Sequence, residues 1–498
     1  LVIQTININS NIPTQNILIP EYYANSQWIN NSPKYSSKDE LVNFLDEIYK
    51  CDKDTINKRE MVKNWINKNV EKWLLDASNG QLFGKGFSMI VGGSTLHDTI
   101  TSDSDMDILI IIPNSSFLIN PYCKECQNIY AQTKKFCDLH DYIFGSNKWS
   151  LYTFLKNELE KVNKDTSFIS KIENARIPLI SIFFEGIDLD IMIAPIPYKN
   201  IPNDLDLTDH KDKKTILKNI QILDNLINEM NKLNDFQYVK SVLMLNGYRI
   251  AYREKFLLID PKIRDKFTNL LKAVKLWAKR KHIYSNIFGY LSGTILTIMV
   301  SKICLIYPSA NLPFLLQQFF LIYSTWTWPI PLITELEEEN LNEISNNKTL
   351  VESWNLTNIN PKDYSNGDKM PIISSNLPHQ NTSFNINEFT KQKIIEQMRE
   401  AFNLFEKNSL KEIQSNNFWS EELFKELNYI DQYKYFIIII CAIKNNNNNN
   451  ENCEFMKTKI RRALVNWVYK TNNVDGELLI EYFDSYHVIS GYQKKKIW

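Results

Sequence analysis

The sequence predicts an α+β protein in which a mixed-sheet domain precedes a helical domain and a small C-terminal α+β domain. Two apolar, strand-like runs each begin with an Asp-x-Asp pattern, at Asp105 and at Asp188. From Lys213 onward, apolar residues recur at helical spacing, and strand-like and helix-like runs alternate again beyond residue 430. We therefore expect an N-terminal arm over 1–36, the sheet domain over 37–235, the helical domain over 236–385 and the last domain over 386–498.

Composition indicates a folded protein without an overall basic surface. The 498 residues suffice for two or three domains, and 44% hydrophobic with 12% aromatic residues exclude a disordered chain. The formal net charge of +0 argues against nonspecific coating of nucleic acid. Any nucleic-acid binding must then come from local basic runs. An ordinary solvated surface explains each of these runs equally well. The runs are Lys279-Arg280-Lys281, Lys457 with Lys459, Arg461 and Arg462, and Lys494-Lys495-Lys496.

Nothing in the sequence indicates a membrane protein. The start of the chain has neither a basic segment nor a long apolar run, so no signal peptide is predicted. The most apolar stretch, 287–307, is interrupted by polar residues and is interpreted as a buried core helix. Seven cysteines in a chain of this length suggest a reducing compartment, and we expect an intracellular protein. The heavy use of Asn, Ile and Lys fits an AT-rich genome.

Two helices are expected before the sheet. Ser37 to Glu40 resembles an N-terminal cap, and apolar residues follow it at helical spacing through Ile48. A second helix is predicted over about Thr55 to Ala77, with the apolar stripe Ile56, Met61, Trp65, Val70 and Trp73.

The most informative stretch is Met89 to Ile112. An apolar run stops at Gly92, Gly93 and Ser94, a polar interval follows, and Asp105-Met106-Asp107 leads into five aliphatic residues. Alternate residues of a strand share a face, so Asp105 and Asp107 lie together. Adjacent carboxylates at the mouth of a buried strand repel each other unless a cation neutralises them, and oxygen ligands of this kind suit Mg²⁺.

A further acid has the same setting in a later strand. Asp188 and Asp190 share one face of the apolar run 183–193. Gly-Ser, a spacer, Asp-x-Asp on a strand and a later inward Asp resemble the signature of the DNA polymerase beta-like nucleotidyltransferase superfamily, and the spacing within that family motif favours Asp190 over Asp188. The glycine and serine give a tight turn whose N–H groups and hydroxyl can hold a triphosphate. The three acids Asp105, Asp107 and Asp190 would hold two metal ions.

Between these strands lies a cluster spaced like a tetrahedral zinc site, formed by Cys123, Cys126, Cys137 and His140. The segment between the two pairs is short for a zinc finger, and free cysteines in a reduced protein account for the pattern more simply. A Zn²⁺ site is therefore an open alternative.

Helices are expected next over about Asp265 to Arg280, Leu291 to Tyr307 and Glu388 to Phe405, with a linker over 335–347. Strand, helix and strand follow at Tyr433 to Ala442, Phe455 to Val468 and Leu478 to Ser485. This order suggests an RNA-recognition type of domain, although its glycine and aromatic signature is missing.

The helical region closely resembles eukaryotic-type poly(A) polymerases. The matching blocks occur in family order over about residues 60 to 460, and they are Leu245 to Arg249, Ala273 to Arg280, Ile283 to Gly293, Leu305 to Pro308, Phe319 to Leu321, Trp326 to Pro329 and Lys369 to Ile373. Members from giant DNA viruses share the Asn, Ile and Lys bias, so the resemblance favours a viral member.

The resemblance implies a palm-like nucleotidyltransferase domain, a helical central domain and an RNA-recognition-like domain, with ATP and the RNA 3′ end meeting between them. It implies template-independent transfer of AMP from ATP to an mRNA 3′ hydroxyl, with release of pyrophosphate and two Mg²⁺ or Mn²⁺ ions. Asp105, Asp107 and Asp190 would be the catalytic, metal-binding acids, and Asp190 could accept the hydroxyl proton. The ATP-binding positions would be Gly93, Ser94, Asn246, Lys275, Lys279, Tyr284, Gly293 and Thr294.

Two departures and several alternatives accompany this interpretation. Gly92 stands where the family usually has an aromatic residue, and Ser292-Gly293 stands in place of a Gly-Gly pair. Another terminal nucleotidyltransferase, adding uridylate or CCA, is the nearest alternative, and a catalytically silent RNA-binding subunit is the other. A homodimer could supply extra RNA surface, although no sequence feature demands one. Host cytoplasm or virion is expected for a viral protein, and the nucleus for a cellular one.

Overall fold

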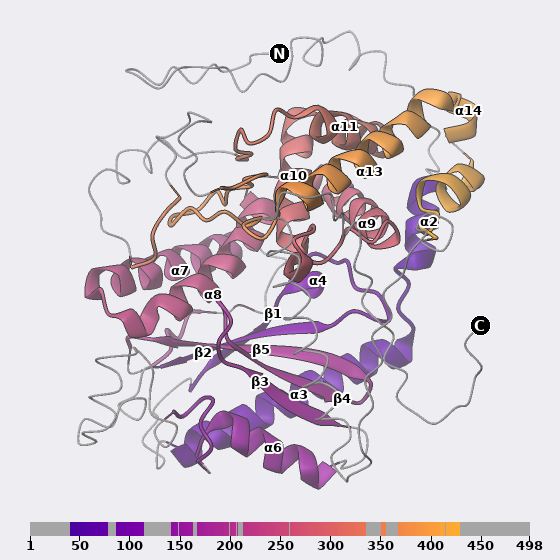
Figure 1. The fold of residues 1–498 in the computed structure, drawn as a ribbon. Helices are drawn as coiled ribbons and strands as arrows, with labels where there is room; N and C mark the ends of the chain where they lie inside the picture. Colours follow the sequence, from indigo (N-terminus) through magenta and orange to yellow (C-terminus); the bar gives the residue numbers. More distant parts are fainter. Residues whose placement is uncertain are drawn as a thin grey trace, which may run out of the picture.

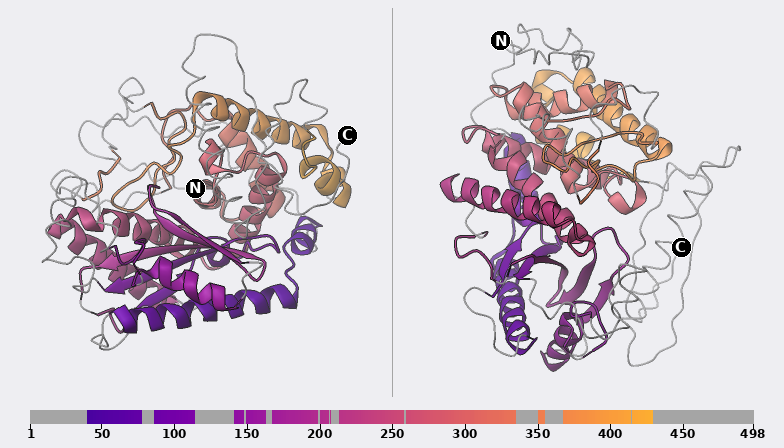
Figure 2. Two further views of the ribbon diagram at one scale, coloured as in Figure 1. Left: turned by 60° about the horizontal axis from the view of Figure 1, so that its bottom comes forward. Right: turned by 90° about the vertical axis from the view of Figure 1, so that its left-hand side faces the viewer.

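The computed structural model describes residues 40–77, 86–113, 141–162, 167–257, 259–334, 350–354, 367–413 and 415–428, apart from 148, 199, 206 and 208–212. These residues form two layers, with a sheet and its covering helices in one and a helical bundle in the other (Figures 1 and 2). The predicted arm at 1–36 and the predicted elements beyond residue 430 lie outside the described residues. The mixed α+β class is confirmed.

The sheet has five strands in the order β1-β2-β5-β4-β3. Their bounds are Ser88–Val91 for β1, Met106–Pro113 for β2, Phe168–Ile172 for β3, Leu179–Phe184 for β4 and Ile187–Ile196 for β5. Strands β2 and β5 pair in parallel, and the other neighbours pair antiparallel. Strands β4 and β5 are joined at Glu185 and Gly186, which both have positive φ as a two-residue hairpin turn requires. The two Asp-x-Asp strands of the sequence are thus the central parallel pair.

Helices cover the two faces of the sheet unequally (Figure 1). On one face, α3 (Lys53–Ala77) and α6 (Leu151–Val162) pack against a continuous apolar surface that runs from β2 to β3. On the other face, α7 (Lys213–Leu233) and α8 (Val239–Tyr252) pack on the distal halves of β2 and β5, at Leu109, Ile111, Ala194 and Ile196. The beginnings of β2 and β5, where the aspartates lie, are outside this second apolar core.

The predicted helix 55–77 is confirmed, but its predicted apolar stripe is partly wrong. Val70 and Trp73 are buried against the sheet and Trp65 packs beside them, whereas Ile56 is 55% exposed and Met61 is 46% exposed. The buried positions at the start of the stripe are Val62 and Ile66. They continue the four-residue spacing back from Val70, which keeps one face toward the sheet.

The helical layer is one apolar core built from α2 (Glu40–Ile48), α9 (Arg264–Arg280), α10 (Gly293–Ile306), α11 (Leu312–Thr325) and α13 (Glu388–Lys407). Side-chain caps fix three of the helix starts, since Ser292 caps α10, Asn311 caps α11 and Asn387 forms a capping box with Thr390. The apolar stretch around α10 is a core helix, as expected. Among the described residues, no helix has the length and apolar character needed to cross a bilayer.

The layers do not follow the expected domain boundaries residue by residue. Helix α2 packs in the helical core although it precedes the sheet, and α13 continues that core beyond residue 385. Conversely, α8 lies on the sheet although it begins beyond residue 235. The chain therefore passes from the helical layer to the sheet layer and back.

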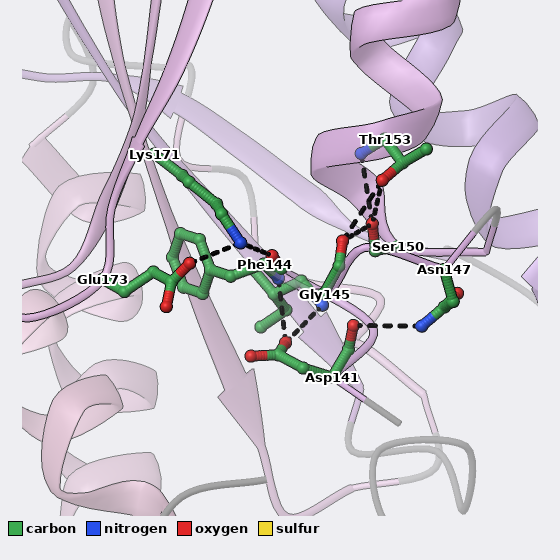
Figure 3. Close-up of polar contacts among 9 residues, drawn as sticks. Asp141, Phe144, Gly145, Asn147, Ser150, Thr153, Lys171 and Glu173 are labelled. Carbon is green, nitrogen blue, oxygen red and sulfur yellow. Dashed lines mark hydrogen bonds and ion pairs between the residues drawn. The ribbon is translucent and has the colours of Figure 1, made fainter. Parts of the chain in front are cut away.

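A network of polar contacts fixes the segment that precedes α6 (Figure 3). The Asp141 carboxylate accepts hydrogen bonds from the backbone N–H groups of Ile143 and Phe144, at 2.9 and 2.8 Å. Lys171 of β3 donates to the Phe144 carbonyl at 2.6 Å and pairs with Glu173 at 2.5 Å. Partial burial raises the pKa of the Asp141 carboxyl. This arrangement points Lys171 to the α6 side of the sheet.

A second buried acid lies where α8 meets the helical layer. Glu254 is in the π-helical turn η3 (Arg253–Leu257) and is fully buried. Its Oε1 accepts hydrogen bonds from the hydroxyls of Thr334 at 3.0 Å and Ser375 at 3.2 Å, whereas Oε2 has no partner among the described residues. Burial raises the pKa of this carboxyl from 4.5 to about 7.

We expect Glu254→Gln to remove a pH dependence of stability. Because the native pKa of Glu254 lies above its unfolded value, its contribution is present at low pH and is lost as the pH rises through about 7. The loss for the wild type is about 3 kcal/mol at 1.36 kcal/mol per unit. Urea denaturation of both proteins from about pH 5 to about pH 8 measures the difference, and parallel stability curves would contradict this assignment.

Candidate active site

The Gly-Ser turn packs directly against Asp107. The N–H of Gly92 donates to the Asp107 carbonyl at 2.8 Å, and Gly93 follows with a φ of +54°. A Cβ on Gly93 would lie 1.8 Å from Oδ2 of Asp107, so only glycine fits beside this carboxylate. Gly93 begins the short helix α4 (Gly93–Leu96), in which the Ser94 hydroxyl is buried without a partner among the described residues. The sequence-predicted turn and acid are therefore one unit.

The three predicted acids meet at the mouth of the parallel strand pair. Asp105 directly precedes β2 and is exposed, while Asp107 is the register partner of Asp190 on β5. Asp188 is exposed and lies one pleat earlier on β5. The register brings Asp107 beside Asp190, but no three His, Cys, Asp or Glu side chains in the described part of the chain lie close enough together to form a metal-binding group as they stand.

Burial and the neighbouring acids both disfavour the charged form of Asp107. Burial raises the pKa of Asp107 to about 7, with further raising contributions from Asp105 and Asp190 and smaller lowering contributions from Lys275 and Arg59. A divalent cation would favour the charged form of all three acids. The donors are all carboxylate oxygens, which is the ligand chemistry of Mg²⁺ or Mn²⁺. The residues therefore fit such ions.

The helical layer brings two lysines to the same place. Lys275 of α9 is buried, and its Nζ lies 3.4 Å from the Thr99 hydroxyl and 5.9 Å from the ring centre of Tyr284. Burial and the neighbouring Lys279 lower the pKa of Lys275 to about 8, although Asp105 and Asp107 act in the opposite direction. Lys279 is partly exposed, 4.0 Å from Asp103. The lysines and the carboxylates thus face each other across the junction of the layers.

Tyr284 and Gly293, which the sequence predicted as ATP-binding positions, lie close together. Tyr284 and Leu291 form an isolated β-bridge, and a Cβ on Gly293 would lie 3.3 Å from the Tyr284 hydroxyl. Burial raises the pKa of Tyr284, and Asp105 and Asp107 raise it further, which places its hydroxyl within their field. Thr294 is exposed beside Gly293 in the first turn of α10.

Asn246 has a different setting from the other predicted ATP-binding residues. It is buried in α8, donates to the Pro378 carbonyl at 3.2 Å and accepts from Arg249 at 2.9 Å. Arg249 also donates to the Leu377 carbonyl and pairs with Asp224. The Asn246 amide nitrogen thus ties α8 directly to the segment around Pro378, its oxygen orients Arg249 of the same helix, and its contact with nucleotide stays a prediction.

Two other predicted features have separate outcomes. The cluster of Cys123, Cys126, Cys137 and His140 lies outside the described residues, as do the basic runs beyond residue 450. In the remaining basic run, Lys281 donates to the Lys425 carbonyl at 2.9 Å and Arg280 lies 3.7 Å from Glu426. Part of that run therefore attaches α9 to a neighbouring segment of the chain.

Arg59 is a site residue that the sequence did not reveal. This buried arginine of α3 donates to the Ser104 carbonyl at 2.7 Å and to the Asp105 carbonyl at 3.0 Å, and its guanidinium lies 3.5 Å from the Thr95 hydroxyl. Burial lowers the pKa of Arg59, whereas Asp105 and Asp107 oppose that effect. One planar guanidinium thus holds the Gly-Ser turn and the approach to Asp105 together.

Comparison with known families identifies both layers. Residues 145–226 match the poly(A) polymerase nucleotidyltransferase domain, and residues 266–426 match the poly(A) polymerase central domain. The chain is therefore similar to poly(A) polymerases in both of these regions. The nucleotidyltransferase match includes Asp190 and begins after Asp105 and Asp107, while the central match includes Lys275, Lys279, Tyr284 and Gly293.

Curated poly(A) polymerases are similar over much of the chain. Poly(A) polymerase PAPa of Candida albicans is 25% identical over 423 residues, which are 82% of this chain and 63% of the relative. Poly(A) polymerase PAPalpha of the same organism is 26% identical over 298 residues, 60% of this chain and 46% of the relative. The chain thus spans less than two thirds of the length of these polymerases.

Solved structures show a more distant likeness. The apo crystal structure of mtPAP has a TM-score of 0.43 and 12% identity, with coverage of 82% of this chain and 76% of that one. The Cid1 poly(U) polymerase has a TM-score of 0.39 and 15% identity, with coverage of 78% and 99%. Likeness at this level does not bear on which nucleotide the chain uses.

We expect Gly93→Ala to displace the Asp107 carboxylate. The added Cβ would overlap Oδ2 of Asp107, and the positive φ would add backbone strain of about 1 to 3 kcal/mol. Gly92→Ala is the matched control, because its Cβ would meet nothing closer than the Asp107 carbonyl at 4.0 Å. Calorimetric titration with Mn²⁺ and thermal melting should show weaker binding and lower stability for Gly93→Ala alone. Equal behaviour of the two variants would refute the close approach.

Replacing Arg59 should loosen the carboxylate site without removing a ligand. Arg59→Ala leaves the Ser104 and Asp105 carbonyls without their buried donor, at a cost of about 1 to 3 kcal/mol for each unpaired group. Arg59→Lys retains one charge but cannot bridge all three oxygens, so we expect Mn²⁺ affinity in the order wild type, Lys, Ala. The surface variant Lys58→Ala serves as the control, and unchanged Mn²⁺ affinity in Arg59→Ala would exclude a positioning role.

Proposed function

We propose that this chain is a template-independent polynucleotide adenylyltransferase that transfers AMP from ATP to the 3′ hydroxyl of RNA. In this reaction the 3′ oxygen forms a bond to the α-phosphorus, the bond to the β-phosphate breaks, and pyrophosphate leaves. The observation that supports the proposal most is the register of the central parallel strands, which pairs Asp107 with Asp190, while Lys275 of α9 approaches the Gly-Ser turn with its Nζ 3.4 Å from the Thr99 hydroxyl. The match of both layers to poly(A) polymerase domains supports ATP as the nucleotide.

Each set of residues has a distinct part in this proposal. Asp105, Asp107 and Asp190 would hold the two Mg²⁺ or Mn²⁺ ions, which when bound activate the attacking oxygen and stabilise the leaving pyrophosphate. Lys275 and Lys279 approach from α9 and neutralise the opposite side of the triphosphate. The Gly93–Ser94 turn offers backbone N–H groups and an unsatisfied hydroxyl beside the same phosphates. Asp190 accepts the proton of the 3′ hydroxyl.

The base would lie on the helical side of the site. Tyr284 lies against Gly293 in the first turn of α10 and 5.9 Å from the Nζ of Lys275, and Thr294 follows Gly293 in the same turn. A pocket that hydrogen-bonds adenine leaves buried polar groups unpaired when another base enters, which is the physical basis of selection. Asn246 and a C-terminal RNA-recognition-like domain complete the proposed set of nucleotide and RNA contacts.

The decisive test is primer extension by the full chain with each nucleoside triphosphate separately. We expect Mg²⁺-dependent extension of an RNA oligonucleotide with ATP, and at least a hundredfold loss in Asp107→Asn, of the order seen when a key electrostatic group is removed. Asp107→Asn should also fold at least as stably without added metal, because it relieves repulsion from Asp105 and Asp190. Asp188→Asn, the neighbouring exposed acid, is the matched control.

Other results would select the alternatives. Preferential extension with UTP would identify a uridylyltransferase, and addition limited to CCA would identify a CCA-adding enzyme. RNA binding without extension by any nucleotide would identify a silent binding subunit. Full activity in Asp107→Asn would overturn the site assignment even if ATP is the substrate.

A further inference from the structure

We propose that Phe168 and Phe183 form a stacking platform for the last bases of the RNA acceptor strand, beside the carboxylates. This inference rests on the proposed function and adds to it a binding site for the acceptor. It starts from the sheet register, which shows which residues of β4 and β3 lie on the same face of the sheet as the carboxylates.

The strand register places the two rings on the same face as the acids. Asp190 pairs with Ser181 and Asp188 pairs with Phe183 across β5 and β4, and directly opposed residues of an antiparallel pair share a face. Across β4 and β3, Phe183 pairs with Phe168. Phe183 is thus a diagonal neighbour of Asp190, at roughly 7 to 8 Å, which is within reach of an aromatic side chain.

The opposite face of the same strands is fully occupied. Ile180, Ile182 and Phe184 of β4 are at most 2% exposed, because they pack against α3 and α6. Lys171 of β3 also points to that side, where it donates to the Phe144 carbonyl (Figure 3). By strand alternation, Phe168 and Phe183 must lie on the other side, where both rings are partly exposed.

The two rings are arranged as a short stack. Their centroids are 5.4 Å apart, and the interplanar angle is only 15°. The stack runs across the strands, from β3 through β4 toward β5. A base placed over the start of β5 would therefore continue the stack on the outer side of Phe183, and its ribose would lie close to Asp190. Every base has a π-face, so stacking of this kind holds an acceptor without selecting its sequence.

Polar groups in the adjacent row suit a nucleic-acid backbone. Ser181 and Ser170 oppose each other one pleat beyond the rings, and both are partly exposed on the same face. Hydroxyl groups can form hydrogen bonds with phosphate and ribose oxygens, whereas aromatic rings stack on bases. A row of rings beside a row of hydroxyls therefore suits a nucleic-acid strand, whose bases lie beside its backbone. Because the platform adjoins the acids that would position the 3′ hydroxyl, the acceptor RNA is the occupant that this arrangement favours.

The platform can be tested in the full chain with Phe168→Leu, Phe183→Leu and the double variant. Leucine keeps apolar bulk and removes the ring. Each change should weaken the Kd of a fluorescent oligo(A) about tenfold, as expected for loss of one base–aromatic stack, and should raise the primer KM similarly. The KM for ATP should remain that of the wild type, and Phe183→Trp should restore RNA affinity.

Phe154→Leu is the control, because Phe154 is a partly buried ring in the same domain that packs on the opposite face of the sheet. Unchanged oligo(A) affinity in the double variant would overturn the platform. A raised KM for ATP alone would also overturn it, because the rings would then contact the incoming nucleotide. A lower melting temperature alone would overturn it as well, because the rings would then have only a structural role. The Kd is measured without ATP, so it tests the platform even if the wild type adds no adenylate and the proposed function fails.

Discussion

The burial of Asp107 between two further carboxylates is the interaction on which the rest of the site depends. Burial and the two neighbouring carboxylates raise the pKa of Asp107 to about 7, so its charged form is disfavoured where it lies. The position is enforced by backbone contacts, because Gly92 bonds to its carbonyl and Gly93 leaves the space that its carboxylate occupies. The apolar cores on both faces of β2 and β5 supply the stability that opposes this local strain.

The second constraint is the placement of the two layers, since the lysines and the carboxylates belong to different ones. Polar contacts connect the layers at two places. Lys255 donates to the Leu96 carbonyl at 2.8 Å and pairs with Asp98 at 2.5 Å, immediately after α4. At the far end of β3 and β4, Arg176 bonds to Gln380 and lies 4.8 Å from the ring centre of Phe384. Contacts at both ends of the junction therefore limit how far the layers can move apart.

The sequence revealed those parts of the site whose chemistry is local along the chain. Gly93, Ser94, Asp105 and Asp107 occupy one short stretch, and a glycine turn beside clustered acids is typical of a site for phosphate and metal. The family motif favours Asp190 over Asp188, and the register agrees with that prediction because it pairs Asp190 with Asp107.

Arg59 could not be found from the sequence, because it acts on backbone carbonyls 45 and 46 residues away and has no motif of its own. The apolar stripe of α3 failed at Ile56 and Met61 for a related reason. Helical spacing identifies a face, but tertiary contacts decide how far along the helix that face stays covered. The Phe168–Phe183 stack depends entirely on which strands become neighbours, so neither phenylalanine stands out before the topology is known.

Under the proposed function, the opposed pKa shifts of Asp107 and Lys275 favour a nucleotide that carries divalent ions. The pKa of the acid is raised to about 7 and that of the lysine is lowered to about 8, mainly because each is buried, while the charge of each favours the charged form of the other. A free triphosphate would satisfy Lys275 and repel Asp107, and a free cation would do the reverse. A triphosphate carrying divalent ions presents both charges at once. Such a metal-bound triphosphate therefore favours the charged forms of both Asp107 and Lys275. The two layers together would bind it more strongly than the sum of their separate binding free energies predicts.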